Sequence, residues 1–353
     1  MAVDKSTRKP TISAIVPCYG YGKYLEQCVD SILAQKEVDV DILIIDDAST
    51  DDSLEIAERI SAKCARVEVR RHLTNIGHID TYNEGLLEWA RGDYSILISA
   101  DDVLVEGALA RAASVMQQYP NVGLVYGHAI NWVDDKPLPA ARTVPSSIKV
   151  WRGHDWIRRV CKLGHNVITS PEVVVRTRAQ QEVGGYRRDL PHSGDLEMWL
   201  RFAARHDVAF IEGADQAYYR IHSNNMTVSR SPVIDLRQRA KAFDSFFEDS
   251  GRLLDNAHKL QRAAQRKIAK EALWRACRAY DRRRLQQTPV SELKQFAQET
   301  FTEADGLPEA FGLRWREWVG PGVPPYLQPF MFSAIHRRLR TILWWRRWRR
   351  KGV

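Results

Sequence analysis

Acidic residues directly follow two apolar segments of this 353-residue chain. The segment at 40–45 leads into Asp46 and Asp47, and the segment at 94–98 leads into Ser99-Ala100-Asp101-Asp102. The pair at 101–102 suits a hard divalent cation that also binds phosphate oxygens. Carboxylates at 46–47 could accept hydrogen bonds from a nucleobase N–H or a ribose hydroxyl. Both groups also have a plainer interpretation, as loop acids that cap the next helix.

Two later segments carry further polar groups. Asp195 precedes Leu196, Trp199 and Leu200, which have the spacing of a helix face. Such an acid could cap the helix or act as a general base in a cleft. The polar loop that follows Tyr219 offers the cation of Arg220 and the imidazole of His222. A single histidine is more often structural than a ligand, so this loop is ambiguous by itself.

The first third of the chain alternates short apolar runs with amphipathic segments. Strands are expected at 11–16, 40–45, 67–71, 94–98 and 122–126, and helices at 21–35, 53–63, 79–90 and 106–119. This order predicts an α/β fold whose central sheet is mostly parallel and covered by helices. Ligands bind at the carboxyl ends of the strands in such sheets. The loops at 17–20, 46–50, 72–77 and 99–103 should therefore meet at one edge.

The rest of the chain divides by composition. Residues 132–150 are rich in Pro, Ala and Ser and suggest a surface excursion, after which short strands and helices return at about 151–228. Helical periodicity prevails at 231–303, and three prolines at 321–325 precede a final basic stretch. We expect a catalytic domain at 1–230, a helical extension at 231–329 and an amphipathic tail at 330–353. Within the first domain, about 11–131 would bind a nucleotide and about 151–228 would face an acceptor.

Taken together, seven short motifs resemble the family 2 glycosyltransferases, which have the GT-A fold. These motifs occur in the family's order between about residues 11 and 228. They are Val16-Pro17-Cys18-Tyr19, Asp46-Asp47-Ala48-Ser49-Thr50-Asp51, Asn75-x-Gly77 with Asn83-x-Gly85, Ser99-Ala100-Asp101-Asp102, Val183-Gly184-Gly185-Tyr186, Asp195-x-Glu197-x-Trp199-Leu200-Arg201, and Tyr219-Arg220-x-His222.

The resemblance implies an inverting transfer from a nucleoside-diphosphate sugar, most often a UDP-sugar, to a hydroxyl of a saccharide or lipid-linked acceptor in bacterial-type polysaccharide or glycoconjugate synthesis. It implies a divalent cation, Mn²⁺ or Mg²⁺. The implied roles are Asp195 as catalytic base, Asp101, Asp102 and His222 at the metal, and a donor site formed by Pro17, Tyr19, Asp46, Asp47, Asn75, Gly77, Ser99 and Arg220. Asp47 would contact the base.

One position departs from the family pattern. The first acid of the family's D-x-D motif is Ser99 in this chain. A hydroxyl can bond to a ribose hydroxyl but brings no charge to a metal. The metal would therefore have one carboxylate fewer than in the family pattern, a charge that Asp102 could supply.

Charge is concentrated at the end of the chain. The net charge is +8, from 52 Lys and Arg against 44 Asp and Glu, and residues 336–353 hold seven Arg, one Lys and no acid. Removing those eight cations leaves 44 against 44, so the body is formally neutral. A neutral body argues against a nucleic-acid-binding protein. Five widely spaced cysteines without zinc-like spacing, and no visible signal peptide, suggest a cytoplasmic protein, either free or peripheral at the inner face of a membrane.

Three interpretations of the tail are open. Phe332, Ile335, Leu339, Ile342 and Trp345 would share one helical face, with arginines largely off that face. Basic residues with tryptophan on an amphipathic helix suit an anionic membrane surface, to which the tail would be a detachable anchor. The alternatives are a helix packed on its own domain and a nucleic-acid contact.

Two other functions compete with glycosyl transfer. A sugar nucleotidyltransferase shares the expected sheet, but it would need a Gly-rich loop with Arg or Lys after the first strand, and only Lys23 is nearby. A non-enzymatic membrane-surface adaptor on a transferase scaffold would not need Asp47, Asp101, Asp195 and His222. Both alternatives are weaker than transfer.

Overall fold

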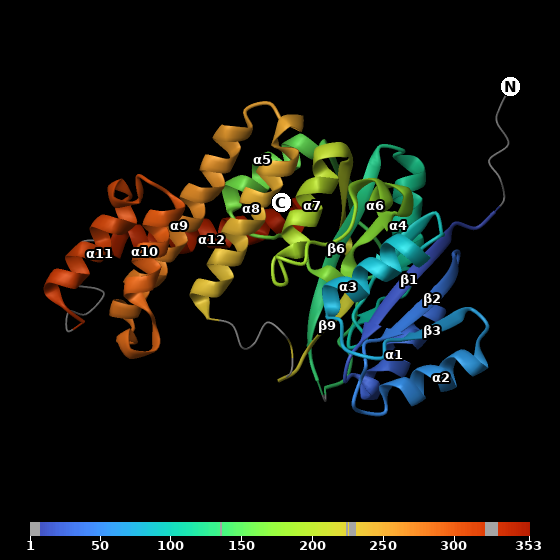
Figure 1. The fold of residues 1–353 in the computed structure, drawn as a ribbon. Helices are drawn as coiled ribbons and strands as arrows, with labels where there is room; N and C mark the ends of the chain where they lie inside the picture. The colour runs from blue at the N-terminus through green and yellow to red at the C-terminus, as the bar shows by residue number, and fades with distance from the viewer. Residues whose placement is uncertain (1–7, 135, 224, 226–230, 322–330) are drawn as a thin grey trace, which may run out of the picture.

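A single curled sheet organises the N-terminal part of the chain (Figure 1). The computed structural model describes residues 8–321 and 331–353, except 135, 224 and 226–230. Its strands are β1 Thr11–Cys18, β2 Asp39–Asp46, β3 Val67–Arg71, β4 Tyr94–Leu97, β5 Val103–Leu104, β6 Val122–Val133, β7 Ser147–Trp151, β8 Val174–Arg176 and β9 Asp207–Ile221. They are ordered β3-β2-β1-β4-β8-β6-β9-β5, with β7 paired to β9.

Helices cover both faces of this sheet. They are α1 Gly22–Leu33, α2 Ser53–Lys63, α3 His78–Asn83, α4 Ala108–Gln118, α5 Gly153–Leu163, α6 Thr177–Val183 and α7 Gly194–Arg205. Side chains on a strand alternate between faces, so Ile12, Ala14 and Val16 pack with α1, α2 and α4, whereas Ile15 packs in the core that contains α5, α6 and α7. This layered arrangement confirms the predicted α/β class, with a mostly parallel central sheet flanked by helices.

The C-terminal half is helical. It contains α8 Pro232–Ser250, α9 Ala257–Asp281, α10 Val290–Thr300, α11 Pro308–Val319 and α12 Met331–Lys351, with 3₁₀ turns η3 Gly251–Leu253, η4 Leu285–Gln287 and η5 Ala304–Gly306. Helices α8 to α11 lie beside the sheet rather than over it, and the chain end returns to the middle of the molecule (Figure 1). Within the described residues, no helix is long and apolar enough to cross a bilayer.

Three local features differ from the expectations. The helix expected at 79–90 is α3 followed by a π-helical turn, η1 Glu84–Trp89. The sheet is parallel from β3 to β4 and again between β6 and β9, as expected, but β8 runs antiparallel to both β4 and β6. The surface excursion expected at 132–150 is also wrong in part, since β6 extends to Val133 and β7 occupies 147–151. These pairings depend on residues far away in sequence, which local periodicity cannot reveal.

The end of the chain is docked on the body, which corrects the expectation of a detachable anchor. Val353 is 3% exposed, and the Trp151 side chain donates to the Lys351 carbonyl at 2.9 Å. Trp344 and Trp348 pack against the core, while Leu339, Ile342, Leu343 and Trp345 face outward and are 44–62% exposed. The side chains of Phe332 and Ile335 lie outside the described part of the chain. The packing interpretation therefore holds for one face of α12.

Candidate active site

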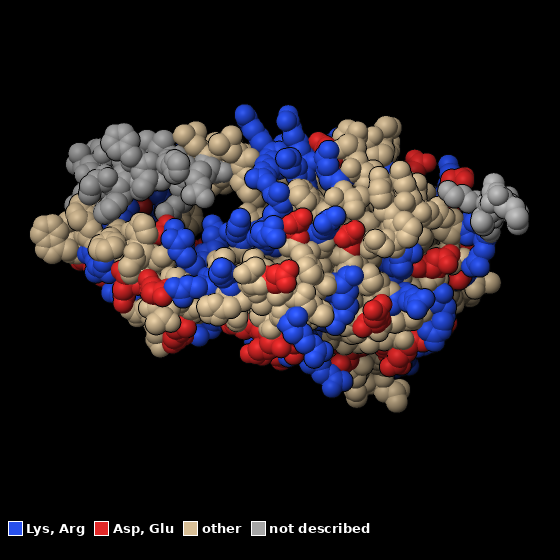
Figure 2. Space-filling model, turned by 90° about the horizontal axis from the view of Figure 1, so that it is seen from above, with Lys and Arg blue, Asp and Glu red and all other residues tan. Residues whose placement is uncertain are grey.

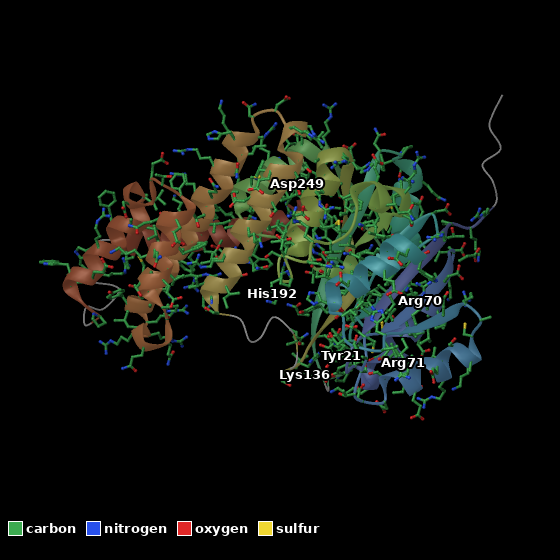
Figure 3. The ribbon with its side chains drawn as sticks, viewed as in Figure 1. Tyr21, Arg70, Arg71, Lys136, His192 and Asp249 are labelled. Carbon is green, nitrogen blue, oxygen red and sulfur yellow. The ribbon has the colours of Figure 1, made fainter. Side chains whose placement is uncertain are left out.

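The carboxyl ends of β1, β2 and β4 bring the predicted loops to one edge. These strands are neighbours and run parallel, with Cys18 opposite Asp46 and Ile15 opposite Leu97. The loops at 17–20, 46–50 and 99–102 therefore leave the sheet together, as the parallel order predicts. Figure 3 shows Tyr21 at this edge and Asp249 far from it, at the end of α8.

Asp101 and His222 form a buried pair at this edge. Asp101 Oδ2 lies 3.0 Å from His222 Nε2, and each side chain is 7% exposed. Asp102 turns differently, since its Oδ1 accepts from the backbone N–H of Arg220 at 2.9 Å. Burial, followed by repulsion from Asp101, raises the pKa of Asp102 well above its usual value. In the part of the chain that the structure describes, no three His, Cys, Asp or Glu side chains are grouped to hold a metal ion alone.

Arg220, predicted as a donor contact, is placed to order the loop that carries Asp101 and Asp102. Its Nε donates to the Asp101 carbonyl at 2.7 Å, and its two terminal nitrogens donate to Asp134 and Gln27. The guanidinium also stacks 4.0 Å from the Trp132 ring centroid. Because the guanidinium is 4% exposed and bonded through all three nitrogens, its visible role is to hold Asp101 and Asp102 in place.

Asp47 supports the loop at 72–77. Its Oδ1 accepts from the Ile76 N–H and lies 2.8 Å from His72 Nδ1, and its Oδ2 accepts from the Gly77 N–H. Gly77 has φ +88°, a conformation that glycine adopts without strain. Oδ2 keeps acceptor capacity for a further donor such as a nucleobase N–H. Asn75, predicted at the same site, is exposed on this loop.

The neighbouring positions predicted for the donor site differ in exposure. Tyr19 is 52% exposed and Pro17 is half-buried, so both can meet a ligand. Asp46 is 1% exposed; its Oδ2 accepts from the Ser49 N–H, and its Oδ1 has no hydrogen-bond partner among the described residues. Ser99 is half-buried beside Asp101.

Asp195 opens α7 and is bonded by two hydroxyls. Ser170 Oγ donates to Asp195 Oδ2, and the Tyr186 hydroxyl also bonds to this carboxylate. Burial, followed by the charge of Asp195, raises the pKa of Tyr186 well above its usual value. Burial also raises the pKa of Tyr82, and the charges of Asp195 and Asp101 both add to it. The candidate base and the candidate metal pair therefore act on the same tyrosine.

Two of the sequence motifs have a structural role beside Asp195. Glu197 is fully buried and paired with Arg201, whose nitrogens also donate to the carbonyls of Val183 and Gly185. The Asn83 side chain binds the backbone of Tyr186, since it donates to the Tyr186 carbonyl and accepts from the Tyr186 N–H. A Cβ at Gly185 would lie 2.5 Å from Asn83 Oδ1, so only glycine fits there. These contacts hold Tyr186 against Asp195.

Some residues of the site were missed by the sequence reasoning. The rings of Tyr21 and Tyr24 lie 5.5 and 5.3 Å from the His222 ring, and Tyr24 donates to Asp134 at 2.5 Å. The spacing of Tyr21 and Tyr24 after the first strand was the available signal. Ser170 carried no signal, because its role depends on a contact 25 residues away.

The sequence matches a known family model over 155 of its residues. The model described as glycosyl transferase family 2 aligns with residues 13–167. An uncharacterized Mycobacterium tuberculosis protein, MT1568, is 29% identical over 230 residues, covering 59% of this chain and 67% of that protein. Glycosyltransferase GlyG of Streptococcus pneumoniae is 32% identical over 121 residues, covering 34% of this chain and 40% of its own. The match thus spans less than half of GlyG.

Solved structures share the fold at low sequence identity. Staphylococcus aureus TarS, residues 1–349 in complex with UDP-GlcNAc, gives a TM-score of 0.62 at 17% identity and covers 84% of this chain and 83% of its own. The mannosyltransferase PcManGT of Pyrobaculum calidifontis, with GDP-Man and Mn²⁺, gives 0.52 at 15% identity, covering 89% of this chain and 81% of its own. At these identities, the likeness establishes the architecture.

Proposed function

We propose that this chain, which belongs to the family 2 glycosyltransferases, transfers a sugar from a nucleoside diphosphate to an acceptor hydroxyl with inversion at the anomeric carbon. The observation that carries the proposal is the placement of two acidic centres at one sheet edge. Asp101 with His222 lies at the end of β4, and Asp195 opens α7, with Tyr82 influenced by both. A single displacement needs these two functions: one that receives the departing diphosphate and one that activates the acceptor.

The donor side of the proposal rests on Asp47 and its loop. The nucleobase would lie near Asp47 Oδ2, with Tyr19 and Pro17 as apolar walls and Ser99 near the ribose. A UDP-sugar is the favoured donor, since TarS, with the same architecture, has been solved with UDP-GlcNAc. A GDP-sugar is the alternative donor, since PcManGT has been solved with GDP-Man.

A divalent cation fits the donor set at Asp101 and His222. A carboxylate and an imidazole would supply two ligands, and diphosphate oxygens would complete the shell, as Mg²⁺ and Mn²⁺ commonly require. The crowding of Asp101 and Asp102 in a buried loop also favours a positive charge there. When bound, the cation stabilises negative charge that grows on the leaving diphosphate. Arg220 keeps both acids in position.

Asp195 is proposed as the general base. Its carboxylate would accept the proton of the acceptor hydroxyl as that oxygen attacks the anomeric carbon. The hydroxyls of Ser170 and Tyr186 fix its orientation and favour its charged form, because both can donate to it. Glu197 is excluded from this role by its buried ion pair with Arg201.

The acceptor is proposed to be a saccharide or lipid-linked molecule at an anionic membrane surface. The outward face of α12 supports this, since exposed Leu339, Ile342 and Leu343 adjoin exposed Arg346 and Arg350. Seen from above, Lys and Arg side chains gather over the middle of the molecule (Figure 2). Apolar side chains flanked by cations are typical of a helix that lies in a membrane interface. Sedimentation with anionic vesicles, and its absence with neutral ones, tests this placement.

An assay of donor consumption tests the proposed function. Purified protein is incubated with Mn²⁺ and UDP-, GDP-, ADP-, CDP- or TDP-sugars, and the nucleoside diphosphate released is measured by chromatography. One of these donors should be hydrolysed, with water as the acceptor, and NMR during the first minutes should show the inverted anomer of the sugar before its anomers equilibrate. Release of pyrophosphate from a sugar phosphate and a nucleoside triphosphate would instead identify a nucleotidyltransferase. No turnover of any substrate would favour the non-enzymatic adaptor.

A further inference from the structure

The segment at 164–172, between α5 and β8, carries the serine that bonds to the candidate base. Ser170 begins the 3₁₀ turn η2 Ser170–Glu172, and its hydroxyl donates to Asp195 Oδ2. Glu172 is 2% exposed and accepts from the Thr169 N–H, which closes a capping box around this turn. The position of Ser170 thus depends on how the whole segment is held.

The last two turns of α12 hold this segment from its other side. Trp348 Nε1 donates to the Val167 carbonyl at 3.0 Å, three residues before Ser170. The Trp344 ring packs edge-on to His165, with 5.3 Å between centroids. Both tryptophans belong to the buried face of α12, so the contact joins the end of the chain to the core.

The end of α12 is fixed firmly enough to act as a support. His128 Nε2 lies 3.0 Å from the Arg349 carbonyl, and the His128 ring packs 4.9 Å from that of Trp348. A Cβ added at Gly352 would lie 2.6 Å from Phe210 Cγ, so the chain end enters a closely packed site. Since His128 and Phe210 lie on β6 and β9, the helix end is anchored on the sheet itself.

We propose that α12 is a positioning element of the active site: Trp348 holds the segment at 164–170, and thereby keeps Ser170 bonded to Asp195. The inference rests on the proposed role of Asp195 as base. A hydroxyl that donates to a carboxylate favours the charged form and lowers its pKa. Loosening this segment would misorient the base and raise its pKa, without changing any group that contacts the donor nucleotide. Trp348 is therefore a positioning residue, acting through Ser170.

The test compares Trp348→Phe with Trp345→Phe. The first change removes the indole N–H and keeps an aromatic ring, and the second alters a half-exposed tryptophan on the same helix. Trp348→Phe should lower kcat about 3- to 30-fold, the range of coupling through a packed contact. The donor KM should not change, and the acid limb of the kcat/KM profile should move to higher pH. Trp345→Phe should match the wild type in all three readouts.

A double-mutant cycle separates positioning from general stability. Ser170→Ala should shift the acid limb in the same direction, and adding Trp348→Phe to Ser170→Ala should cause little further loss, because both act through one hydrogen bond. Multiplicative losses, or a lowered melting temperature with an unchanged pH profile, would overturn the proposal.

The same measurements distinguish a failure of the positioning role from a failure of the proposed function. If Trp348→Phe does not unfold cooperatively, Trp344→Phe replaces it, since it alters the same segment at His165. If the wild type consumes donor and Trp348→Phe behaves as Trp345→Phe, the positioning role of Trp348 is wrong, while the proposed function stands. If the wild type consumes no nucleotide sugar, the proposed function fails first.

Discussion

At the scale of single residues, the account depends on Asp195. Asp195→Asn keeps the shape of the side chain but cannot accept a proton at neutral pH. Donor affinity should therefore remain, while transfer falls by about 10²–10⁴-fold, the usual contribution of a general base. Steady-state turnover and calorimetric titration with the nucleoside diphosphate measure the two quantities. Asp249→Asn, at an exposed acid on α8, is the control and should retain wild-type turnover (Figure 3).

His72 gives a prediction about pH and stability. Burial alone would lower the pKa of His72, but its hydrogen bonds to Asp47 and Glu84 outweigh burial and raise the pKa above the usual value. Because the pKa of His72 is higher in the folded than in the unfolded protein, its protonation stabilises the fold. This contribution is fully present below the unfolded-state pKa of about 6.5, and it is lost as pH rises through the folded-state pKa.

His72→Gln should consequently destabilise the protein most at low pH. At pH 6 the loss should be about 1.5–3 kcal/mol, the range for hydrogen bonds to charged groups. Thermal unfolding between pH 5 and 9 should show the gap to wild type narrowing as pH rises. His78→Gln is the control, because His78 bonds to the Pro191 carbonyl rather than to an acid. A gap that stays constant with pH would show that His72 is not charged in the folded protein.

Much of the site was predictable at this scale, and the limits are physical. The placement of Asp101 near His222 was inferred from motif order, and the structure brings the two to 3.0 Å. The engagement of Asp47 by the amides of Ile76 and Gly77 was not predictable, because backbone donors carry no residue-type signal. The burial of Arg220 among protein acceptors was missed for a different reason, because its side-chain partners Gln27 and Asp134 are 193 and 86 residues away in the sequence.

At the scale of elements, the helical extension is joined by a charged network between α8 and α9. Glu271 accepts from both Arg239 and Arg275, and these arginines also reach Asp235. Burial would raise the pKa of Glu271, but the two guanidinium groups hold it at about 2. A lowered pKa stabilises the fold above the unfolded value of about 4.3, and that contribution is lost as pH falls toward 2.

Glu271→Gln should therefore lower stability by about 1–3 kcal/mol at pH 7, since Arg239 is left partly uncompensated in a buried setting. The deficit should shrink as pH falls below about 4. Chemical denaturation at pH 7 and at pH 3 measures it. Glu299→Gln removes an exposed partner of Arg237 and should cost at most about 1 kcal/mol. An equal cost for both variants would contradict the role given to this network.

The strands and helices themselves follow from local sequence more directly than their pairing does. The short apolar runs of the sequence predicted the ends of β1 to β4 within one or two residues. They could do so because strands buried in a parallel sheet are continuous apolar runs. The antiparallel insertion of β8 between β4 and β6 requires side chains from 94–97, 122–133 and 174–176 to meet. Nothing in any one of these segments specifies such a partner.

At the scale of the whole molecule, charge separates the end of the chain from the body. The eight cations of residues 336–353 account for the whole net charge of +8. Because one face of α12 is packed, the other face determines what the tail can bind. Changing Arg346, Arg349 and Arg350 together to Ala should weaken binding to anionic vesicles about 100-fold, at about 1 kcal/mol for each cation near the surface.

A matched control removes the same charge elsewhere. The three exposed arginines at 282–284 follow α9, and changing all three to Ala should leave vesicle binding nearly unchanged. Raising the salt concentration should weaken wild-type binding only in part, since the apolar contact of Leu339 and Ile342 is not screened. If both triple variants lose binding equally, attraction is a property of net charge rather than of α12.

The central claim is that Asp101 and His222 hold a cation which, with the loop at Asp47, binds a nucleoside diphosphate. Calorimetric titration of UDP or GDP into the protein, with and without Mn²⁺, tests it most directly. The wild type should bind one of them tightly only with Mn²⁺, and Asp101→Ala should lose at least about 10-fold in affinity while its melting temperature without ligand stays within a few degrees. Metal-independent binding, or equal affinity in Asp101→Ala, would contradict the account.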